Sequence, residues 1–298
     1  MKVNQILHNV IHSFTPGTSK RKVNHFTLMT YPYIIWIAFL VVLPMLLILL
    51  YAFTVPGNDV ASIQFSFDNF IRFFTEPTFL EVLGRSLLVA FLTTVICIII
   101  GYPMAYIISK MKGNHAMILI LLITFPTWIN MLVRTYAWMG ILQEGGIISS
   151  ICELFGITGV SLIHTHFAVA LGMVYNFLPF MILQIHTSLA KMDNSLLEAA
   201  ADLGANKVQS FLHVTLPLSL PGVVSGITLV FLPAVSSFFI PKLLGGGQYV
   251  LVGNLIESQF LYTGEWHFGS AISLIMAIII IISMWFTRKI DAQQRMEK

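Results

Sequence analysis

The chain has 298 residues, of which 57% are hydrophobic and only 10% charged, and its mean hydropathy is +0.85. Soluble globular domains carry about 25% charged residues, so this composition excludes a soluble protein and indicates one embedded in a membrane. The formal net charge of +3 is no evidence for a nucleic-acid partner, because the excess of basic residues follows membrane topology, as shown below. The two cysteines, Cys97 and Cys152, imply no disulfide framework.

Six apolar stretches are each long enough to cross the hydrocarbon layer as a helix, which takes about 20 residues. They lack the alternating pattern of barrel strands, and lipid cannot satisfy exposed backbone groups, so helices are expected. The sequence therefore predicts an all-α membrane protein with six transmembrane helices and both termini on one side. The expected spans are 32–53, 86–109, 115–139, 165–190, 219–241 and 267–287.

The distribution of Lys and Arg predicts the orientation. With the N-terminus in the cytoplasm, 12 of the 16 basic residues lie inside, as the positive-inside rule requires. Residues 1–31 then form a basic cytoplasmic arm, 32–287 the transmembrane domain and 288–298 a cytoplasmic tail. The outer face carries an acidic excess, which would concentrate a cationic solute; it equally fits the tolerance of exported loops for acids.

Span 115–139 contains an intramembrane arginine, Arg134, which by default is a functional hypothesis. It falls in the outer third of the span, where a long side chain can reach the interface, and this snorkelling is the favoured account. The nearby Trp128 and Tyr136 fit an interfacial aromatic belt as well as a substrate path.

The cytoplasmic loop 191–218 is the most informative segment. Ser195 and Glu198 have the spacing of a capping box, which predicts a helix start. Gly204 suits the left-handed conformation that ends a helix. A second short helix of a turn or two is expected before Pro217. The loop should thus be a rigid protrusion of two helices joined at a glycine.

Two further patterns concern chemistry. Residues 250–261 repeat apolar side chains with a helical period and carry Glu257 on the polar side, which predicts an amphipathic helix at the outer face. The chain has no GxxxxGK[ST] phosphate loop, so nucleotide hydrolysis must reside elsewhere. His164 and His166 form only a weak metal signal, and no metal site is predicted.

The loop resembles the EAA loop of bacterial ABC importer permeases, a cytoplasmic segment that docks on a separate ATPase. The matching spacing runs from Glu-Ala-Ala through a glycine to Leu-Pro, with Val214 in place of the usual Ile. The residues that the resemblance assigns to ATPase coupling are Glu198, Ala199, Ala200, Asp202, Gly204, Leu216 and Pro217.

Nearly the whole chain is similar to the B-type permease subunit of spermidine/putrescine ABC importers. The similarity is carried by FSFDNFIRFF at 65–74, LVRTYAWMGIL at 132–142, VGNLIESQF at 252–260 and WHFGSAIS at 266–273. It implies a non-catalytic, multi-pass subunit of the bacterial cytoplasmic (inner) membrane with the type I ABC importer permease fold. The implied partners are a C-type permease, two ATPase subunits and an extracytoplasmic polyamine-binding protein. This chain would bind no cofactor, since ATP and Mg belong to the ATPase.

Polyamines are extended polycations, so their path should offer carboxylates and ring faces. Glu257 is the leading candidate for a substrate carboxylate. Trp128, Tyr136, Tyr175 and Asn176 are further candidates for the substrate path, and an architectural role for each is equally consistent with the sequence.

Two alternatives stay open at this point. The same kind of transporter could carry iron, sulfate or an opine-like solute, although the lack of a buried basic cluster weighs against anions. An ion-coupled secondary transporter should instead carry a charged residue near the centre of a span. Apart from the peripheral Arg134, no span has one.

Overall fold

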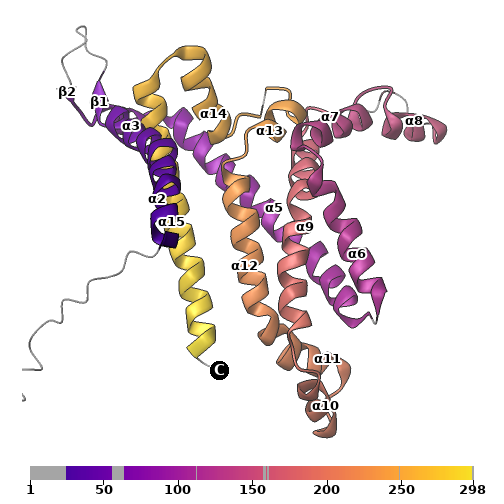
Figure 1. The fold of residues 1–298 in the computed structure, drawn as a ribbon. Coiled ribbons are helices and arrows are strands. Elements are labelled where there is room, and N and C mark those ends of the chain that lie inside the picture. Colours follow the sequence, from indigo (N-terminus) through magenta and orange to yellow (C-terminus); the bar gives the residue numbers. More distant parts are fainter. Residues whose placement is uncertain are drawn as a thin grey trace, which may run out of the picture. The chain divides into compact units, whose positions relative to one another are not determined.

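The computed structural model describes residues 25–55, 64–111, 113–156, 159, 161–247 and 249–296, and most of them are helical (Figure 1). Most of the expected N-terminal arm lies outside these residues. The chain divides into two units, Met1–Leu47 and Ile48–Lys298. The described part of the first unit comprises α2 (His25–Ile37), the π-helical turn η1 (Ala38–Val42) and the start of α3 (Leu43–Ala52), which together form an apolar helix long enough to span a membrane.

The second unit is built on four long helices: α5 (Pro77–Lys110), α9 (His166–Ala190), α12 (Leu216–Val235) and α15 (Trp266–Met296). Each contains an apolar stretch of spanning length, so the described residues hold five candidate spans, or six if one bent helix pair counts as a span. This agrees with the helical membrane class predicted from the sequence. The exception is a two-residue antiparallel ladder between β1 (Thr54–Val55) and β2 (Gln64–Phe65).

The short helices of the second unit gather at the two ends of the long ones. At one end lie α4 (Asp68–Thr75), α7 (Met131–Leu142), α8 (Ile147–Leu154), α13 (Phe239–Leu244), α14 (Val252–Ser258) and the π-helical turn η4 (Gln259–Thr263). At the other end lie α10 (Ser195–Asp202) and α11 (Lys207–Ser210), as Figure 1 shows. We call these the α14 end and the α10 end.

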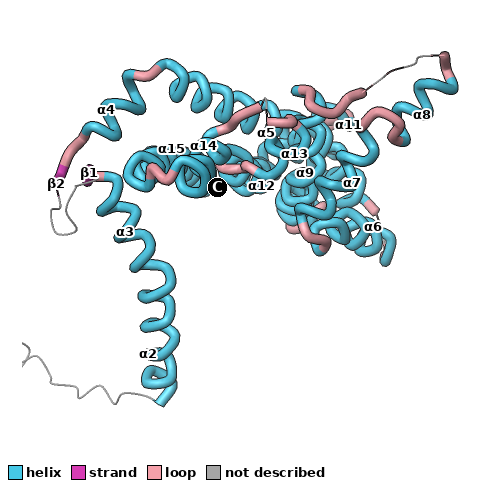
Figure 2. The backbone as a smooth tube through the Cα atoms, turned by 90° about the horizontal axis from the view of Figure 1, so that it is seen from above, coloured by secondary structure: helices cyan, strands magenta, loops and turns pink. Residues whose placement is uncertain are grey.

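The stretch expected to form one straight span at 115–139 is instead broken. α6 (Asn114–Thr124) continues into a 3-10 turn, η2 (Phe125–Trp128), and α7 then departs at an angle of 93°. Asn130 causes the new start, because its side chain accepts a 2.8 Å hydrogen bond from the amide of Leu132 and so caps α7. Figure 2, which looks down from above, shows α8 apart from the cluster of long helices, beyond α7.

The expected span 219–241 also differs from the structure, because α12 ends at Val235 and α13 starts as a separate helix. The side-chain Nδ2 of Asn254 on α14 donates a 2.8 Å hydrogen bond to the carbonyl of Phe238. Gly253 lies so close that a Cβ there would be 2.7 Å from the carbonyl oxygen of Ser236. Contacts with α14, which lies further along the chain, thus stabilise the break between α12 and α13.

Packing of α5, α9 and α12 forms the centre of the second unit. Met173, Met181, Ile182 and Ile185 of α9 are almost wholly buried, as are Cys97 and Ala105 of α5 and Val230 and Ala234 of α12. Glycines let the helices approach: a Cβ at Gly226 would lie 2.5 Å from the Met181 sulfur, and one at Gly101 would lie 3.1 Å from Met181 Cγ. Such small-residue contacts are the usual basis of helix association in membranes.

We predict that Gly222→Val destabilises the protein, because a Cβ at this position would lie 2.5 Å from Ser188 Cβ and 2.8 Å from the carbonyl oxygen of Gln184. Overpacking of this kind costs about 1–3 kcal/mol. The thermal unfolding midpoint of the solubilised protein, followed by size-exclusion chromatography after heating, should fall.

Gly84→Ala is the matched control. Gly84 lies in α5, and no atom lies within 4 Å of the position that a Cβ would take there. Alanine is also the better helix former by about 1 kcal/mol. This variant should unfold at or above the wild-type temperature. An unchanged midpoint for Gly222→Val would contradict the close α9–α12 contact.

Candidate functional site

The loop between α9 and α12 forms a compact helical hairpin at the α10 end. α10 ends at Asp202, and Gly204 has a positive φ of 82°. The amide of Gly204 donates to the carbonyl of Ala201 (2.9 Å) and that of Ala205 to the carbonyl of Ala200 (3.0 Å). This pair of bonds is a Schellman motif, so the glycine ends the helix as its position predicted.

The predicted capping box at Ser195 and Glu198 is wrong. The amide of Glu198 donates to the carbonyl of Asn194, so Ser195 is already the first residue inside α10. The start is stabilised instead by Asp193, whose carboxylate accepts a 2.9 Å hydrogen bond from the amide of Ser195. This bond lowers the pKa of Asp193.

A reciprocal capping box is present at the second helix. The amide of Gln209 donates to Asn206 Oδ1, and the amide of Asn206 donates to Gln209 Oε1, both at 2.9 Å. The Asn-x-x-Gln spacing carries this signal in the sequence, with Asn in the place that Ser or Thr takes most often.

The second helix is longer than predicted, because α11 does not stop before Pro217. It passes through a π-helical turn, η3 (Phe211–Thr215), directly into α12, giving one continuous helix from Lys207 to Val235. The amide of Leu216 donates to the carbonyl of Phe211 across the wider turn. Pro217 can therefore follow without breaking the helix, although it has no amide to donate. The second half of the loop and the spanning helix thus form one continuous helix, Lys207–Val235, which we call the rod.

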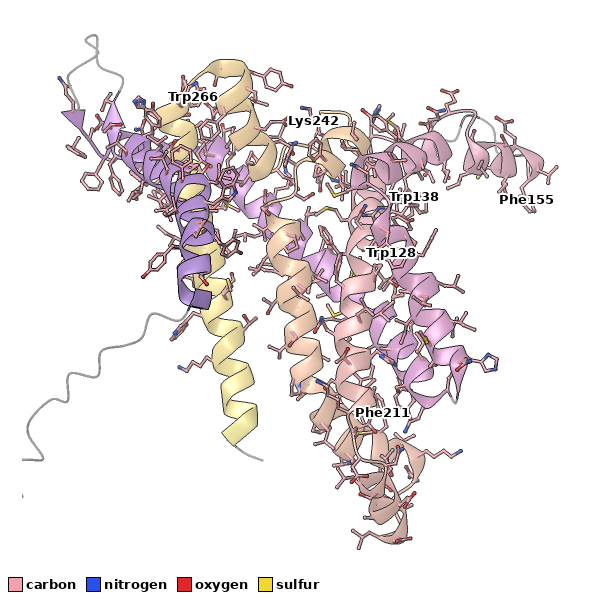
Figure 3. The ribbon with its side chains drawn as sticks, in the orientation of Figure 1. Trp128, Trp138, Phe155, Phe211, Lys242 and Trp266 are labelled. Atoms are coloured by element: carbon pink, nitrogen blue, oxygen red, sulfur yellow. The ribbon has the colours of Figure 1, made fainter. Side chains whose placement is uncertain are left out.

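Aromatic contacts fix this rod to α5. The ring of Phe211 packs edge-on against Tyr102 and Tyr106, with centroid distances of 5.8 and 5.4 Å. The hydroxyls of Tyr102 and Ser219 lie 2.8 Å apart, within hydrogen-bond distance. Figure 3 shows Phe211 at the base of the hairpin, where α11 leads into α12. Movement of the hairpin must therefore reach both α5 and α12.

Most of the predicted coupling residues face outward. Glu198, Ala199, Asp202, Gly204 and Pro217 are exposed, while Ala200 and Leu216 are half-buried. Exposed apolar side chains lie beside them, and of these only Val208 and Leu212 belong to an apolar stripe that is evident in the sequence. Leu203 at the hairpin tip is 89% exposed, and Leu196, Val208 and Leu212 are exposed as well. We call these four side chains the loop apolar patch.

A pocket of about 370 Å³ opens where the hairpin meets the long helices. It is lined by residues from the end of α9, the start of α10 and the first turns of α12, including Lys191, Leu196 and Pro221. An exposed apolar patch with polar residues around it marks a protein interaction site. The hairpin is therefore a candidate site for contact with another protein.

The five residues predicted for a substrate path lie on four elements. Trp128 in η2 and Tyr136 in α7 are exposed, and Tyr175 of α9 packs edge-on against Trp138 with a centroid distance of 5.3 Å. Asn176, the next residue of α9, is buried and donates to the carbonyl of Gly172 within its own helix. Glu257 lies on α14 and pairs with a lysine, Lys242 of α13, as described below.

Arg134 lies in α7 at the α14 end and is half-buried, so its reach to a membrane interface stays a prediction. Its Nε and Nη1 atoms are buried and have no hydrogen-bond partner among the described residues. Of the two histidines at the weak metal signal, His166 packs its ring against Tyr249 with a centroid distance of 4.5 Å. Within the part of the chain that the structure describes, no three His, Cys, Asp or Glu side chains gather as metal ligands.

Comparison with known proteins identifies the family. No protein-family model matches the chain. It is 39% identical to the spermidine/putrescine transport system permease protein PotB of Haemophilus influenzae, over 83% of this chain and 88% of the relative. It is 36% identical to PotB of Escherichia coli K12, over 82% and 90% of the two chains.

The fold has a counterpart among solved structures. A chain of the bacterial alginate ABC transporter, in complex with its alginate pentasaccharide-bound periplasmic protein, superimposes with a TM-score of 0.75 at 15% identity. The match covers 90% of this chain and 93% of the other. The fold is thus that of an ABC transporter chain, and the sequence similarity over most of both chains establishes that this chain belongs to the family of spermidine/putrescine transport system permease proteins.

Proposed function

We propose that this chain is the transmembrane subunit of an ATP-driven importer for spermidine and putrescine. The cargo follows from the family, since relatives of 36–39% identity that align over most of their length carry this name. The subunit would form half of the translocation path together with a second, C-type permease. It would have no catalytic activity of its own, because ATP and Mg would be bound by two ATPase subunits.

The single observation that carries the coupling role is the continuity of the hairpin with α12. The helix from Lys207 to Val235 starts in the loop and runs through a membrane span. A continuous helix passes a push at one end to the other with little loss, because its backbone hydrogen bonds run along its length. The loop apolar patch, Leu196, Leu203, Val208 and Leu212, offers the surface on which an ATPase would act.

The orientation in the membrane follows from this role. The α10 end, which carries Lys191 and Lys207, would face the cytoplasm, with both termini on the same side. The α14 end would then face outward and receive the loaded polyamine-binding protein. ATP-driven closure of the ATPases would move the hairpins of both permeases and open the path outward, and hydrolysis would return it to the inward-open state.

The test is uptake of labelled spermidine and putrescine into proteoliposomes that hold the full complex, with loaded binding protein outside and ATP inside. Uptake should require ATP and should fall strongly with Glu198→Ala in the hairpin. Uptake that proceeds equally without ATP would exclude an ABC importer. If the binding protein stimulates ATP hydrolysis but no polyamine is taken up, the chain is still an ABC importer subunit and the proposed substrate is wrong.

A second prediction concerns Gly204. Its φ of 82° is one that alanine adopts at a cost of about 1–2 kcal/mol, and no neighbouring atom would touch a Cβ there. Gly204→Ala should therefore lower the apparent affinity for the ATPase by about five- to thirtyfold, because the hairpin is less often in its binding conformation. Gly204→Asn should weaken it less, since asparagine tolerates this conformation.

Gly156→Ala is the matched control, because Gly156 also has a positive φ, 81°, with no atom near a Cβ. It follows α8 at the α14 end, so it carries the same strain far from the hairpin. ATPase affinity, measured by co-purification at graded ATPase concentrations, should stay at the wild-type value in this control. Equal losses in both variants would refute a specific role for the hairpin.

A further inference from the structure

The α14 end holds an ion pair whose geometry suggests more than structural support. Lys242 Nζ of α13 lies 2.7 Å from Glu257 Oε1 of α14 and 3.2 Å from the hydroxyl oxygen of Tyr262 in η4. The same ammonium lies 5.4 Å from the centre of the Tyr262 ring. A carboxylate, a phenol oxygen and a ring face together are what an alkylammonium ion needs for binding.

We propose that Lys242 is an internal stand-in for the substrate: its ammonium occupies the place at Glu257 that an ammonium group of the polyamine takes when the substrate enters. This proposal rests on the proposed function and adds a substrate-binding group and its competitor. The exchange is cation for cation, so the carboxylate keeps a partner throughout. A neutral or anionic solute could not displace the lysine.

Burial distinguishes the fixed partner from the mobile one. The side chain of Glu257 is 14% exposed, whereas that of Lys242 is 40% exposed. A carboxylate so largely withdrawn from water is unfavourable without a cation. Lysine, in contrast, is a compact charge on a flexible four-carbon stem that can swing out into solvent. The hydrogen bond from Lys242 to Glu257 raises the pKa of the lysine, which therefore remains a cation at neutral pH.

The position of Glu257 is held by backbone contacts. Asn254 of α14 donates to the carbonyl of Phe238, and Gly253 lies against the carbonyls of Ser236 and Ser237. These contacts fix α14 against the chain between α12 and α13, which is the kind of rigid support that a binding group requires. Figure 3 shows Lys242 at this end of the molecule, opposite the coupling hairpin.

A pocket beside the ion pair fits the rest of such a substrate. It has a volume of about 480 Å³, within the range of small-molecule sites. Its walls are mostly apolar, with Phe238, Phe239, Ile256 and Leu261 among them, and Glu257 is the charged residue in its lining. A polyamine alternates ammonium groups with short methylene chains. Its methylenes can lie on these walls while one ammonium binds Glu257.

The other ion pairs among the described residues have a different character. Arg72 pairs with Glu76 and Glu265, and Arg85 pairs with Glu81. In each of them the cation is a guanidinium and the acid side chain is 48% to 69% exposed. Lys242–Glu257 is thus the described pair that combines an ammonium with a largely buried carboxylate next to a pocket.

The experiment measures binding of labelled spermidine to the assembled complex in lipid nanodiscs, trapped with ATP and vanadate and without the binding protein. Lys242→Met removes the competitor and should tighten binding about tenfold, since the unoccupied fraction of the site rises. Glu257→Gln should abolish binding at this site, and the double variant should behave like Glu257→Gln. Arg85→Met, which breaks a pair of the other kind, should bind as the wild type does.

A cysteine variant allows the charge to be added after folding, so that differences in folding between variants cannot explain the result. In a Cys152→Ser background, where the remaining Cys97 is buried, Lys242→Cys should bind spermidine tightly. Reaction with 2-aminoethyl methanethiosulfonate attaches an aminoethyl group to the cysteine through a disulfide, and methanesulfinate leaves. This restores an ammonium to the same folded protein and should return binding to the weaker wild-type level. Methylthiolation, which adds no charge, should leave it tight.

Two outcomes would overturn the proposal. If Lys242→Met and Glu257→Gln both weaken binding and the double variant restores it, the pair is structural. If modification with and without the added charge gives equal affinities, the lysine ammonium does not compete. Either result can coexist with ATP-driven polyamine uptake by the wild type, whereas absence of that uptake would refute the proposed function itself.

Discussion

The close contact between α9 and α12 is the interaction on which the rest of the second unit depends. At Gly222 and Gly226 the two helices approach so nearly that Ser188 and Met181 of α9 occupy the space of a missing side chain. The hairpin that would engage the ATPase is the connection between these same two helices. Force applied to it therefore enters the molecule at a closely packed helix pair, where little of the displacement can be absorbed by loose side chains.

Much of the fold follows from local properties of the sequence. Apolar length gives the long helices, and Gly204 ends α10 because it alone accepts the required backbone conformation cheaply. The differences arise where distant residues decide. α12 stops at Val235 because Asn254 and Gly253 hold the following turn, and these lie far along the chain. The break before α7 was encoded locally, in the cap supplied by Asn130, but the apolar run around it hides that signal.

In the candidate sites, too, local features could be predicted from the sequence and contacts between distant residues could not. The position of the coupling hairpin is evident from its polar sequence between two apolar runs. Its capping box was predicted at the wrong helix, because the Ser-x-x-Glu spacing at Ser195 is more familiar than the Asn-x-x-Gln spacing of Asn206 and Gln209. Glu257 could be selected from the amphipathic pattern of its helix. Its pairing with Lys242 could not, since two separate short helices must pack before the two charges meet.

The tip of the hairpin has a consequence for the life of the subunit before assembly. Leu203 is the most exposed apolar side chain of the loop, and it lies outside any segment of spanning length. Water must solvate it until a partner covers it, which is unfavourable. A permease made in excess of its ATPase would thus display an apolar knob on a polar hairpin, the kind of surface that chaperones and proteases recognise. A leucine that the proposed contact with the ATPase would cover would thus mark an unassembled subunit for removal.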